Sequence, residues 1–213
     1  MESSLESLLM DWPLSVIRDV DVATAVSGSA SRRYAIINRA LHKGNIISLR
    51  RGLYLIGKPY RRGSPSSFEI AHTLYGPSYI SFESALAYHQ WIPEAVYITV
   101  SATSKRANAF ETILGRFEYV HVPVKLFYLG VKRVGSDDEA FLMADPWKAV
   151  ADHYYVYGRD WKTPADLTAD MRIERESMLE SDLSSLKALA ESYQSSRVRK
   201  FLNQMLRGLQ DGN

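Results

Sequence analysis

The chain contains no cysteine among its 213 residues. Disulfide bonds, thiolate metal ligands and a cysteine nucleophile are therefore excluded, and a reducing compartment suits such a chain. No apolar run approaches the roughly 18 residues that a membrane-spanning helix needs. The first residues, MESSLESLLMDW, carry acids where a signal peptide would carry Lys or Arg. We therefore expect a cytoplasmic protein without a membrane partner.

The motifs of common enzymes are missing as well. The chain has no HExxH, no GxSxG, no Walker A loop and no GxGxxG, and its five histidines are scattered. Asp160 and Lys162 form an acid-x-Lys pair, which ends a common signature of metal-dependent nucleases. The strand-like stretch VYITVSAT, however, brings no second acid to bind Mg²⁺. The prediction is a protein that is not an enzyme and that holds no metal and no cofactor.

Acidic residues are absent from residues 22–68, which hold nine Lys and Arg. The remainder holds 17 basic and 24 acidic residues, a net charge of −7, so the net charge of +2 for the whole chain hides a strong asymmetry. A basic segment joined to an acidic remainder is typical of an anion-binding module attached to another unit. A solvated basic face without a partner is the alternative.

The order of predicted elements gives the basic segment a more specific meaning. A leucine stripe predicts a helix over 3–11, Asp21 is a candidate N-cap for a short helix over 22–26, and Ser31 is one for a helix over 32–43. IISL, RRG and LYLIG then predict a hairpin with a tight basic turn. This is the layout of a winged helix-turn-helix, whose last helix enters the major groove of double-stranded DNA.

The sequence leaves two possibilities for which face of the helix over 32–43 is buried, and each is called a phase of the helix. In one phase the core-facing residues are Ile36, Ile37, Ala40 and Leu41. In the other phase they are Tyr34, Ile37 and Leu41. Arg39 points outward in both, so it is the first candidate for a base or phosphate contact. The predicted DNA-binding residues of helix, hairpin and exit segment are Arg32, Arg33, Asn38, Arg39, Lys43, Arg50, Arg51, Arg61 and Arg62.

The character of the chain changes after RRGSPSS, which has the composition of a linker. Ser66 and Glu69 have capping-box spacing. Strands are predicted at PSYIS, VYITVSAT, FEYVHVPV and LFYLGVKRV, and helices at SALAYHQW and DPWKAVADHYYVYG. Thr163-Pro164-Ala165-Asp166 is another N-terminal helix signal. Two amphipathic helices are predicted in ERESMLESDLSSLKALAESY and SSRVRKFLNQMLRGL. The expected fold is α+β, with a winged helix-turn-helix at 1–62 and a larger mixed α/β unit at 63–213 whose C-terminal helices begin near 163.

These blocks, in this order, resemble the AbiEi antitoxins of bacterial type IV toxin–antitoxin systems over roughly residues 15–160. The matching stretches are, in order, a basic helix ending in LHKG, then IISLRRGLYLI, SYISFESALAYHQWIPE, a strand with VSATSKR, GRFEYVHV and ADPWKAVADHYY. The second stretch supplies the residues of an antitoxin-domain motif of unknown role, Ser81, Glu83, Ser84 and His89. The last stretch matches through Pro146, Lys148, Ala149 and Asp152.

The resemblance implies two tasks. The N-terminal unit would bind the promoter of its own operon and repress it, and the rest would counteract a nucleotidyltransferase-type toxin without forming a stable complex with it, in a system of the phage abortive infection kind. Two alternatives stay open. One is a stand-alone winged-helix transcription regulator whose larger domain senses a ligand. The other is a metal-dependent nuclease guided to DNA by the winged helix.

Overall fold

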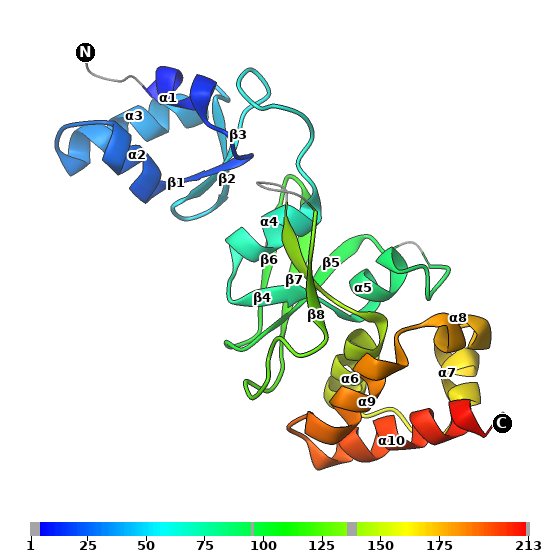
Figure 1. The fold of residues 1–213 in the computed structure, drawn as a ribbon. Coiled ribbons are helices and arrows are strands. Elements are labelled where there is room, and N and C mark those ends of the chain that lie inside the picture. The colour runs from blue at the N-terminus through cyan, green and yellow to red at the C-terminus, as the bar shows by residue number, and fades with distance from the viewer. Residues whose placement is uncertain (1–4, 95, 136–139, 212–213) are drawn as a thin grey trace.

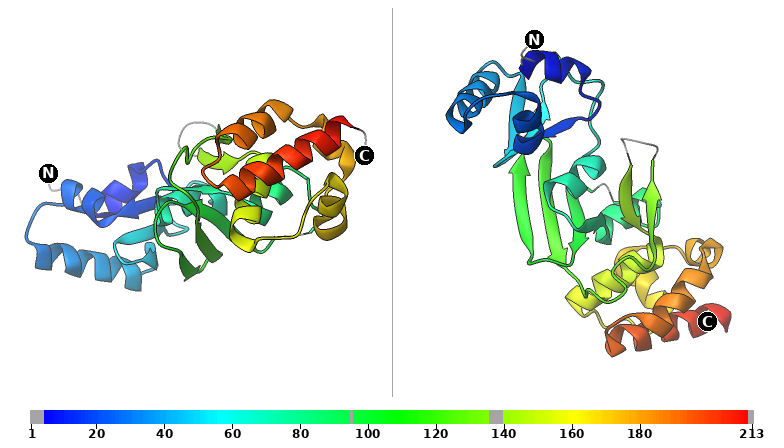
Figure 2. Two further views of the ribbon diagram at one scale, coloured as in Figure 1. Left: turned by 90° about the horizontal axis from the view of Figure 1, so that it is seen from below. Right: turned by 60° about the vertical axis from the view of Figure 1, so that its left-hand side comes forward.

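The protein is a mixed α+β chain in which a small N-terminal sheet with its helices lies at one end and a group of helices at the other (Figure 1; Figure 2). The computed structural model describes residues 5–94, 96–135 and 140–211. The helices are α1 (Leu5–Asp11), α2 (Asp19–Ala25), α3 (Ala30–His42), α4 (Ser67–Leu74), α5 (Phe82–Tyr88), α6 (Pro146–Tyr157), α7 (Pro164–Met171), α8 (Arg175–Glu180), α9 (Leu183–Ser192) and α10 (Ser196–Gln210). The strands are β1 (Val16–Arg18), β2 (Ile46–Arg50), β3 (Leu53–Ile56), β4 (Ser78–Ile80), β5 (Ile98–Thr103), β6 (Asn108–Thr112), β7 (Gly115–His121), β8 (Val131–Val134) and β9 (Phe141–Ala144).

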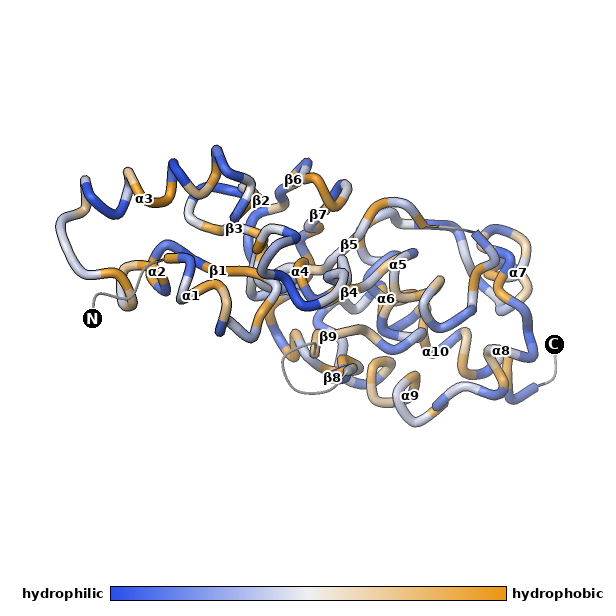
Figure 3. The backbone as a smooth tube through the Cα atoms, turned by 90° about the horizontal axis from the view of Figure 1, so that it is seen from above, coloured by the Kyte–Doolittle hydropathy of each residue, from blue (hydrophilic) through white to orange (hydrophobic). Residues whose placement is uncertain are grey.

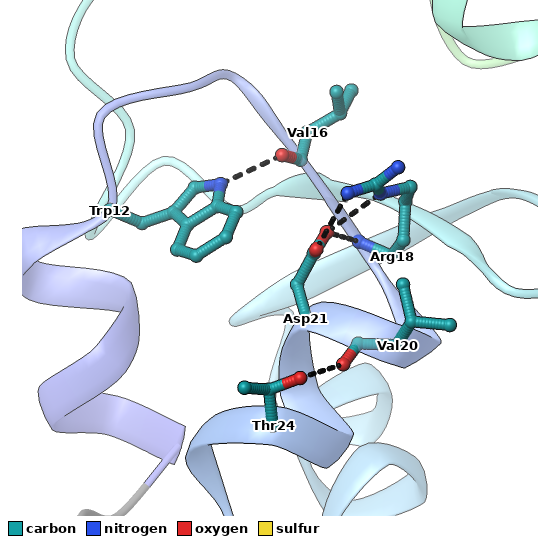
Figure 4. Close-up of polar contacts among 6 residues, drawn as sticks. All are labelled: Trp12, Val16, Arg18, Val20, Asp21 and Thr24. Atoms are coloured by element: carbon teal, nitrogen blue, oxygen red, sulfur yellow. Dashed lines mark hydrogen bonds and ion pairs between the residues drawn. The ribbon is translucent and has the colours of Figure 1, made fainter.

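The predicted hairpin is confirmed as β2 and β3, and it belongs to a three-stranded antiparallel sheet of order β1-β3-β2. Strand β1 was not predicted because three residues are too few for an alternating pattern. It is held by its flanks: the Trp12 indole donates to the Val16 carbonyl oxygen at 2.8 Å, and the Arg18 guanidinium pairs with Asp21 at 2.8 Å (Figure 4).

Two of the predicted helix starts are wrong. Helix α2 begins at Asp19, so Asp21 lies inside its first turn, where the carboxylate accepts the backbone N–H of Arg18 at 2.9 Å. Helix α3 begins at Ala30, and its N-cap is Ser29, whose hydroxyl accepts the N–H of Arg32 at 3.2 Å. Both Ser29 and Ser31 have a side chain suited to an N-cap, and the sequence offers no local rule that chooses between them.

Both faces of the small sheet are buried. One face packs with α1, α2 and α3 around Ile17, Ile46, Tyr54 and Ile56. The other face contributes to the larger hydrophobic core of the chain through Val16, Leu49, Leu53 and Leu55. This explains why all four residues of β3 are buried. The N-terminal unit is therefore joined to the rest of the chain by an apolar contact as well as by the segment near residue 62.

The larger sheet has six strands in the order β6-β7-β5-β4-β9-β8. Strand β5 runs parallel to β7 and antiparallel to β4, and β4 runs parallel to β9. The capping box of Ser66 and Glu69 at the start of α4 is confirmed, as are strands at PSYIS, VYITVSAT and FEYVHVPV, the last of which ends at His121. The strand predicted at LFYLGVKRV is wrong in its first half, because residues 126–130 form turns and β8 begins at Val131. Strands β6 and β9 were not predicted.

Four helices follow α6. The signal of Thr163 and Asp166 is confirmed as the capping box of α7. The stretch ERESMLESDLSSLKALAESY forms two helices rather than one, because the chain leaves helical geometry at Ser181 and restarts at α9 with Asp182 as N-cap. Helix α10 buries one apolar stripe against α9 and α6. Among the described residues, no helix combines the length and apolarity that crossing a membrane requires.

Candidate functional site

Helix α3 presents a basic face to solvent. Ile37 and Ala40 are buried, and Ile36 and Leu41 pack against the same cluster, so the first of the two predicted phases is confirmed. Tyr34 is 69% exposed, which makes the second phase wrong. The helix needs only a narrow apolar stripe here, because on its other side no further layer of the described residues covers it (Figure 3).

The exposed cations of α3 lie on one side of the helix. Arg32, Arg39 and Lys43 line a surface cavity of about 310 Å³ between α1 and α3. Arg39 has an exposed side chain whose Nε–H donates to the Ala35 carbonyl at 3.3 Å, within the same helix. Lys43 lies 3.4 Å from the Glu6 carboxylate in an exposed pair, which contributes little to stability in water. Arg39 and Lys43 thus lie at the surface, where an anion can contact them.

Two further residues of α3 that were predicted to bind DNA are less exposed. Arg33 is half-buried, and its guanidinium donates to the carbonyl oxygen of Gly28 in the turn before the helix. Asn38 is also half-buried. Arg33 therefore holds the turn between α2 and α3, whereas the outward contacts fall to the exposed set of Arg32, Arg39 and Lys43.

The hairpin tip separates its two arginines. The guanidinium of Arg50 turns toward the larger unit, where its Nε–H donates to the carbonyl oxygen at the end of α4, Leu74, at 2.7 Å. Arg51 is exposed. Gly52 has a φ of +74°, which favours glycine at this turn. At the tip, Arg50 is therefore hydrogen-bonded to the larger unit, whereas the side chain of Arg51 is open to solvent.

The exit segment carries the last two predicted DNA-binding residues. Arg61 donates to the Gly63 carbonyl at 3.0 Å, and exposed Arg62 reaches the Met10 carbonyl at 3.5 Å. These bonds place Arg62 beside the end of α1. The two arginines lie on the connection between the units rather than on α3 or the hairpin tip.

Ser81, Lys148 and Asp152 of the larger unit meet in a buried polar network. One carboxylate oxygen accepts from the hydroxyls of Tyr79 at 2.7 Å and Ser81 at 2.9 Å. The other accepts from the Lys148 ammonium at 2.7 Å and the Tyr193 hydroxyl at 3.0 Å. Burial and then the charge of Asp152 raise the pKa of Tyr79 well above its ordinary value, so its hydroxyl stays protonated and donates.

No rule of the sequence pairs the two tyrosines of this network with Asp152. Tyr79 and Tyr193 lie 73 and 41 positions from Asp152 along the chain. Ser81, Lys148 and Asp152 come from two of the stretches that carry the resemblance. A buried charge is stable only when it is paired and hydrogen-bonded. The network therefore gives a structural reason for the serine, lysine and aspartate at these positions.

The three remaining residues of the motif, Ser84, His89 and Glu83, also have partners. Ser84 joins α5 to β5, since its hydroxyl donates to the Ile98 carbonyl and accepts the Val100 N–H. His89 contacts the Ala144 carbonyl at 3.0 Å. Glu83 lies 3.1 Å from the ring nitrogen Nε2 of His153.

Glu83 is the motif residue nearest to a cavity. Burial pushes the pKa of the Glu83 carboxyl up, but the hydrogen bond and charge of His153 outweigh it, so that pKa lies below its ordinary value. Glu83 and His153 line a cavity of about 490 Å³ together with apolar side chains such as Ile92 and Met171. The Nδ1 atom of His153 is buried and has no hydrogen-bond partner among the described residues.

The acid-x-Lys pair lies apart from both sites. Asp160 and Lys162 are exposed in the connection between α6 and α7, where they pair with each other at 3.2 Å. Neither residue belongs to a strand. Over residues 5–94, 96–135 and 140–211, no group of three or more acidic or histidine side chains could hold a metal ion.

Comparison with known proteins gives no match to a protein-family model and none to a curated protein. Function must therefore be inferred from these residues and their geometry.

Proposed function

We propose that the protein is a DNA-binding antitoxin, whose residues 1–62 form a winged helix-turn-helix that represses its own operon. The observation that carries the proposal is the exposed face of α3, where Arg32, Arg39 and Lys43 lie in a segment without any acidic residue of its own. The order helix, strand, helix, helix, hairpin supports the same assignment. Such a repressor acts in the cytoplasm on double-stranded DNA.

In this proposal α3 enters the major groove. Arg39 has the fork of donors that binds guanine O6 and N7, or a phosphate. Arg32 and Lys43 lie nearer the two ends of the helix, where the phosphate backbones flank the groove. Arg51 at the hairpin tip contacts the backbone beside the groove. Most of the affinity then comes from phosphate neutralisation and falls steeply with salt.

The antitoxin role is assigned to the larger unit, against a nucleotidyltransferase-type toxin and without a stable complex. It rests on the resemblance of the motif stretches to AbiEi antitoxins. The meeting of Ser81, Lys148 and Asp152 in one network gives these stretches a shared structural reason to occur together.

A ligand-sensing transcription regulator is the second candidate. The observation in its favour is the cavity at Glu83 and His153, whose volume of about 490 Å³ is that of a small-molecule site. An apolar wall with a few charged groups is the usual composition of such sites. The two candidates share the DNA-binding unit and differ in what the larger unit does.

One experiment tests the proposal and separates its two parts. In the first variant Arg32, Arg39 and Arg51 are changed to alanine, and Arg50 is kept because it holds Leu74. The variant is expected to lose repression of a reporter behind its own promoter. It is also expected to rescue growth when it is expressed with a nucleotidyltransferase-type toxin from foreign promoters. A matched control carries alanine at Lys187, Lys200 and Arg207, which are exposed on α9 and α10.

The outcomes are distinct when protein levels are equal. Repression that survives the first variant, or fails equally in the control, contradicts DNA binding through α3. Failure of the wild-type protein to rescue growth contradicts the antitoxin role and leaves the ligand-sensing regulator. Exposed substitutions of this kind usually change the free energy of unfolding by less than about 0.5 kcal/mol, so both variants should stay folded.

A further inference from the structure

The connection between β5 and β6 carries a second basic pair. Lys105 and Arg106 are both exposed, and residues 97–110 contain no acidic residue. The Arg106 guanidinium makes no hydrogen bond or ion pair with any side chain or backbone group of the described residues. The pair belongs to the larger unit, whose net charge is negative. A local cluster of positive charge in such a unit asks for a specific explanation.

This basic pair is fixed beside the hairpin tip by contacts through the end of α4. The Arg50 guanidinium holds the Leu74 carbonyl, and the next residue, Tyr75, donates its hydroxyl to the Arg106 carbonyl at 3.0 Å. The Lys105 ammonium donates to the Gly76 carbonyl at 2.5 Å and lies 5.5 Å from the centre of the Tyr75 ring. One of its three N–H donors is committed in this way, which leaves two for an anion.

The pair also lies on the side of the molecule that carries α3. Strand β2 contacts α3 at one flank and β6 at the other. Figure 3 shows α3, β2 and β6 following one another along one side of the molecule, and the left-hand view of Figure 2 agrees. A rod that lies along α3 and passes the hairpin tip would therefore continue over the start of β6.

Acidic residues of the same sheet edge do not cancel this charge. Glu111 and Glu118 lie on β6 and β7, and both are paired with Arg116, at 2.6 and 2.7 Å. Pairing leaves this group of three with one net negative charge, against two positive charges on Lys105 and Arg106. These five side chains together carry one net positive charge, which favours contact with a phosphate backbone.

We propose that Lys105 and Arg106 form a second phosphate-binding patch, which contacts the backbone of double-stranded DNA outside the segment that α3 reads. The proposal rests on the DNA-binding function proposed above and extends it, because it makes the larger unit part of the DNA contact. The footprint then covers more DNA than a winged helix alone would occupy.

The test measures binding of the full chain to fluorescently labelled random-sequence duplexes of about 30 bp, or three helical turns, by anisotropy at several salt concentrations. The variants are Lys105→Ala with Arg106→Ala, and as matched control Lys132→Ala with Arg133→Ala. The control pair lies on β8, at the opposite edge of the same sheet. Each lost phosphate contact should lower the slope of log affinity against log salt by about 0.9. The first variant should thus lose about two units of slope, and the control none.

The single variant Arg106→Ala keeps the test independent of the folding of this connection, because only the backbone carbonyl of Arg106 is used in a described contact. It should lose about one unit of slope. On a duplex of about 10 bp, or one turn, bound at α3, wild type and variants should bind alike.

A wild-type slope in both patch variants overturns the patch and leaves the proposed function standing, provided Arg39→Ala weakens binding in the same assay. An equal loss in the Lys132/Arg133 control also overturns it, since the effect would then come from net charge alone. If the wild-type chain binds no duplex, the proposed function fails and the patch fails with it.

Discussion

The ammonium group of Lys148 lies 2.7 Å from a carboxylate oxygen of Asp152, one helical turn further along α6, and both side chains are buried. Two tyrosines and a serine complete the carboxylate's hydrogen bonds. The pair ties α6 to β4 and to the end of α9, which are far apart in the sequence. A saturated buried carboxylate of this kind fixes the arrangement of the elements around it.

We expect Asp152→Ala to lower the free energy of unfolding by about 3–5 kcal/mol, because it leaves the Lys148 ammonium buried without its counter-charge. Asp160→Ala, on an exposed residue, is the control and should change it by less than about 0.5 kcal/mol. The double variant Lys148→Met, Asp152→Leu should recover part of the loss, since it removes both charges. Urea unfolding measures all three. A double variant no more stable than Asp152→Ala would show that the hydroxyl network, rather than the ion pair, dominates.

Arg39→Ala is expected to cost about 1–3 kcal/mol of binding free energy on the preferred DNA sequence if the guanidinium reads a base. The preferred sequence can be selected from a random duplex library, and affinity is then compared on selected and random DNA. The reason is the exposure of Arg39 on the outward face of α3. Equal losses on both duplexes would make Arg39 a backbone contact.

The two arginines of the hairpin tip are expected to behave differently. Arg50→Ala removes the bond to the Leu74 carbonyl and should lower the free energy of unfolding by about 1 kcal/mol. Arg51→Ala should leave stability unchanged and lower the salt slope of DNA binding by about 0.9. Thermal unfolding and salt titrations distinguish them. An equal decrease of the salt slope in both variants, without a loss of stability in either, would contradict this. It would mean that Arg50 does not keep its hydrogen bond to the Leu74 carbonyl in solution and contacts phosphate as Arg51 does.

A fragment of residues 1–62 is expected to self-associate, because cutting there exposes the second face of the small sheet, with Val16, Leu53 and Leu55. Changing these three residues to threonine should make the fragment monomeric and able to bind DNA. In the full chain the same changes should be strongly destabilising, since they place hydroxyls in the core. Size-exclusion chromatography and thermal unfolding would show both effects. A monomeric, stable unmodified fragment would mean that the two units are independent.

Glu83→Gln should lower stability at neutral pH by less than about 1 kcal/mol, because the Glu83 side chain is 38% exposed. The pKa of Glu83 is lower in the folded protein than in the unfolded chain, so its stabilising effect is present above the ordinary glutamate pKa of about 4. It is lost as the pH falls through the folded-state pKa. The difference in free energy of unfolding between wild type and variant should therefore shrink in acid. A difference that is constant from pH 7 to pH 3 contradicts the pairing with His153.

Short-range sequence patterns, such as turn residues and helix caps, were enough to predict most of the helices and strands. The turn Arg51-Gly52 between two β-rich runs predicted the hairpin, and the spacing of Ser66 to Glu69 and of Thr163 to Asp166 predicted two helix starts. The acid-free segment 22–68 likewise located the basic face. Each of these signals depends on contacts within a few residues, or on charge alone, and so can be read without the fold.

The tertiary structure decided what depends on contacts between distant residues. It selected the phase of α3 by burying Ala40 and exposing Tyr34, and it covered both faces of β3. It also turned Arg50 away from the hairpin tip toward Leu74, and it brought Tyr79 to Asp152 across 73 positions. None of these outcomes follows from propensity, because an amphipathic pattern shows that a face is buried but not which distant element buries it.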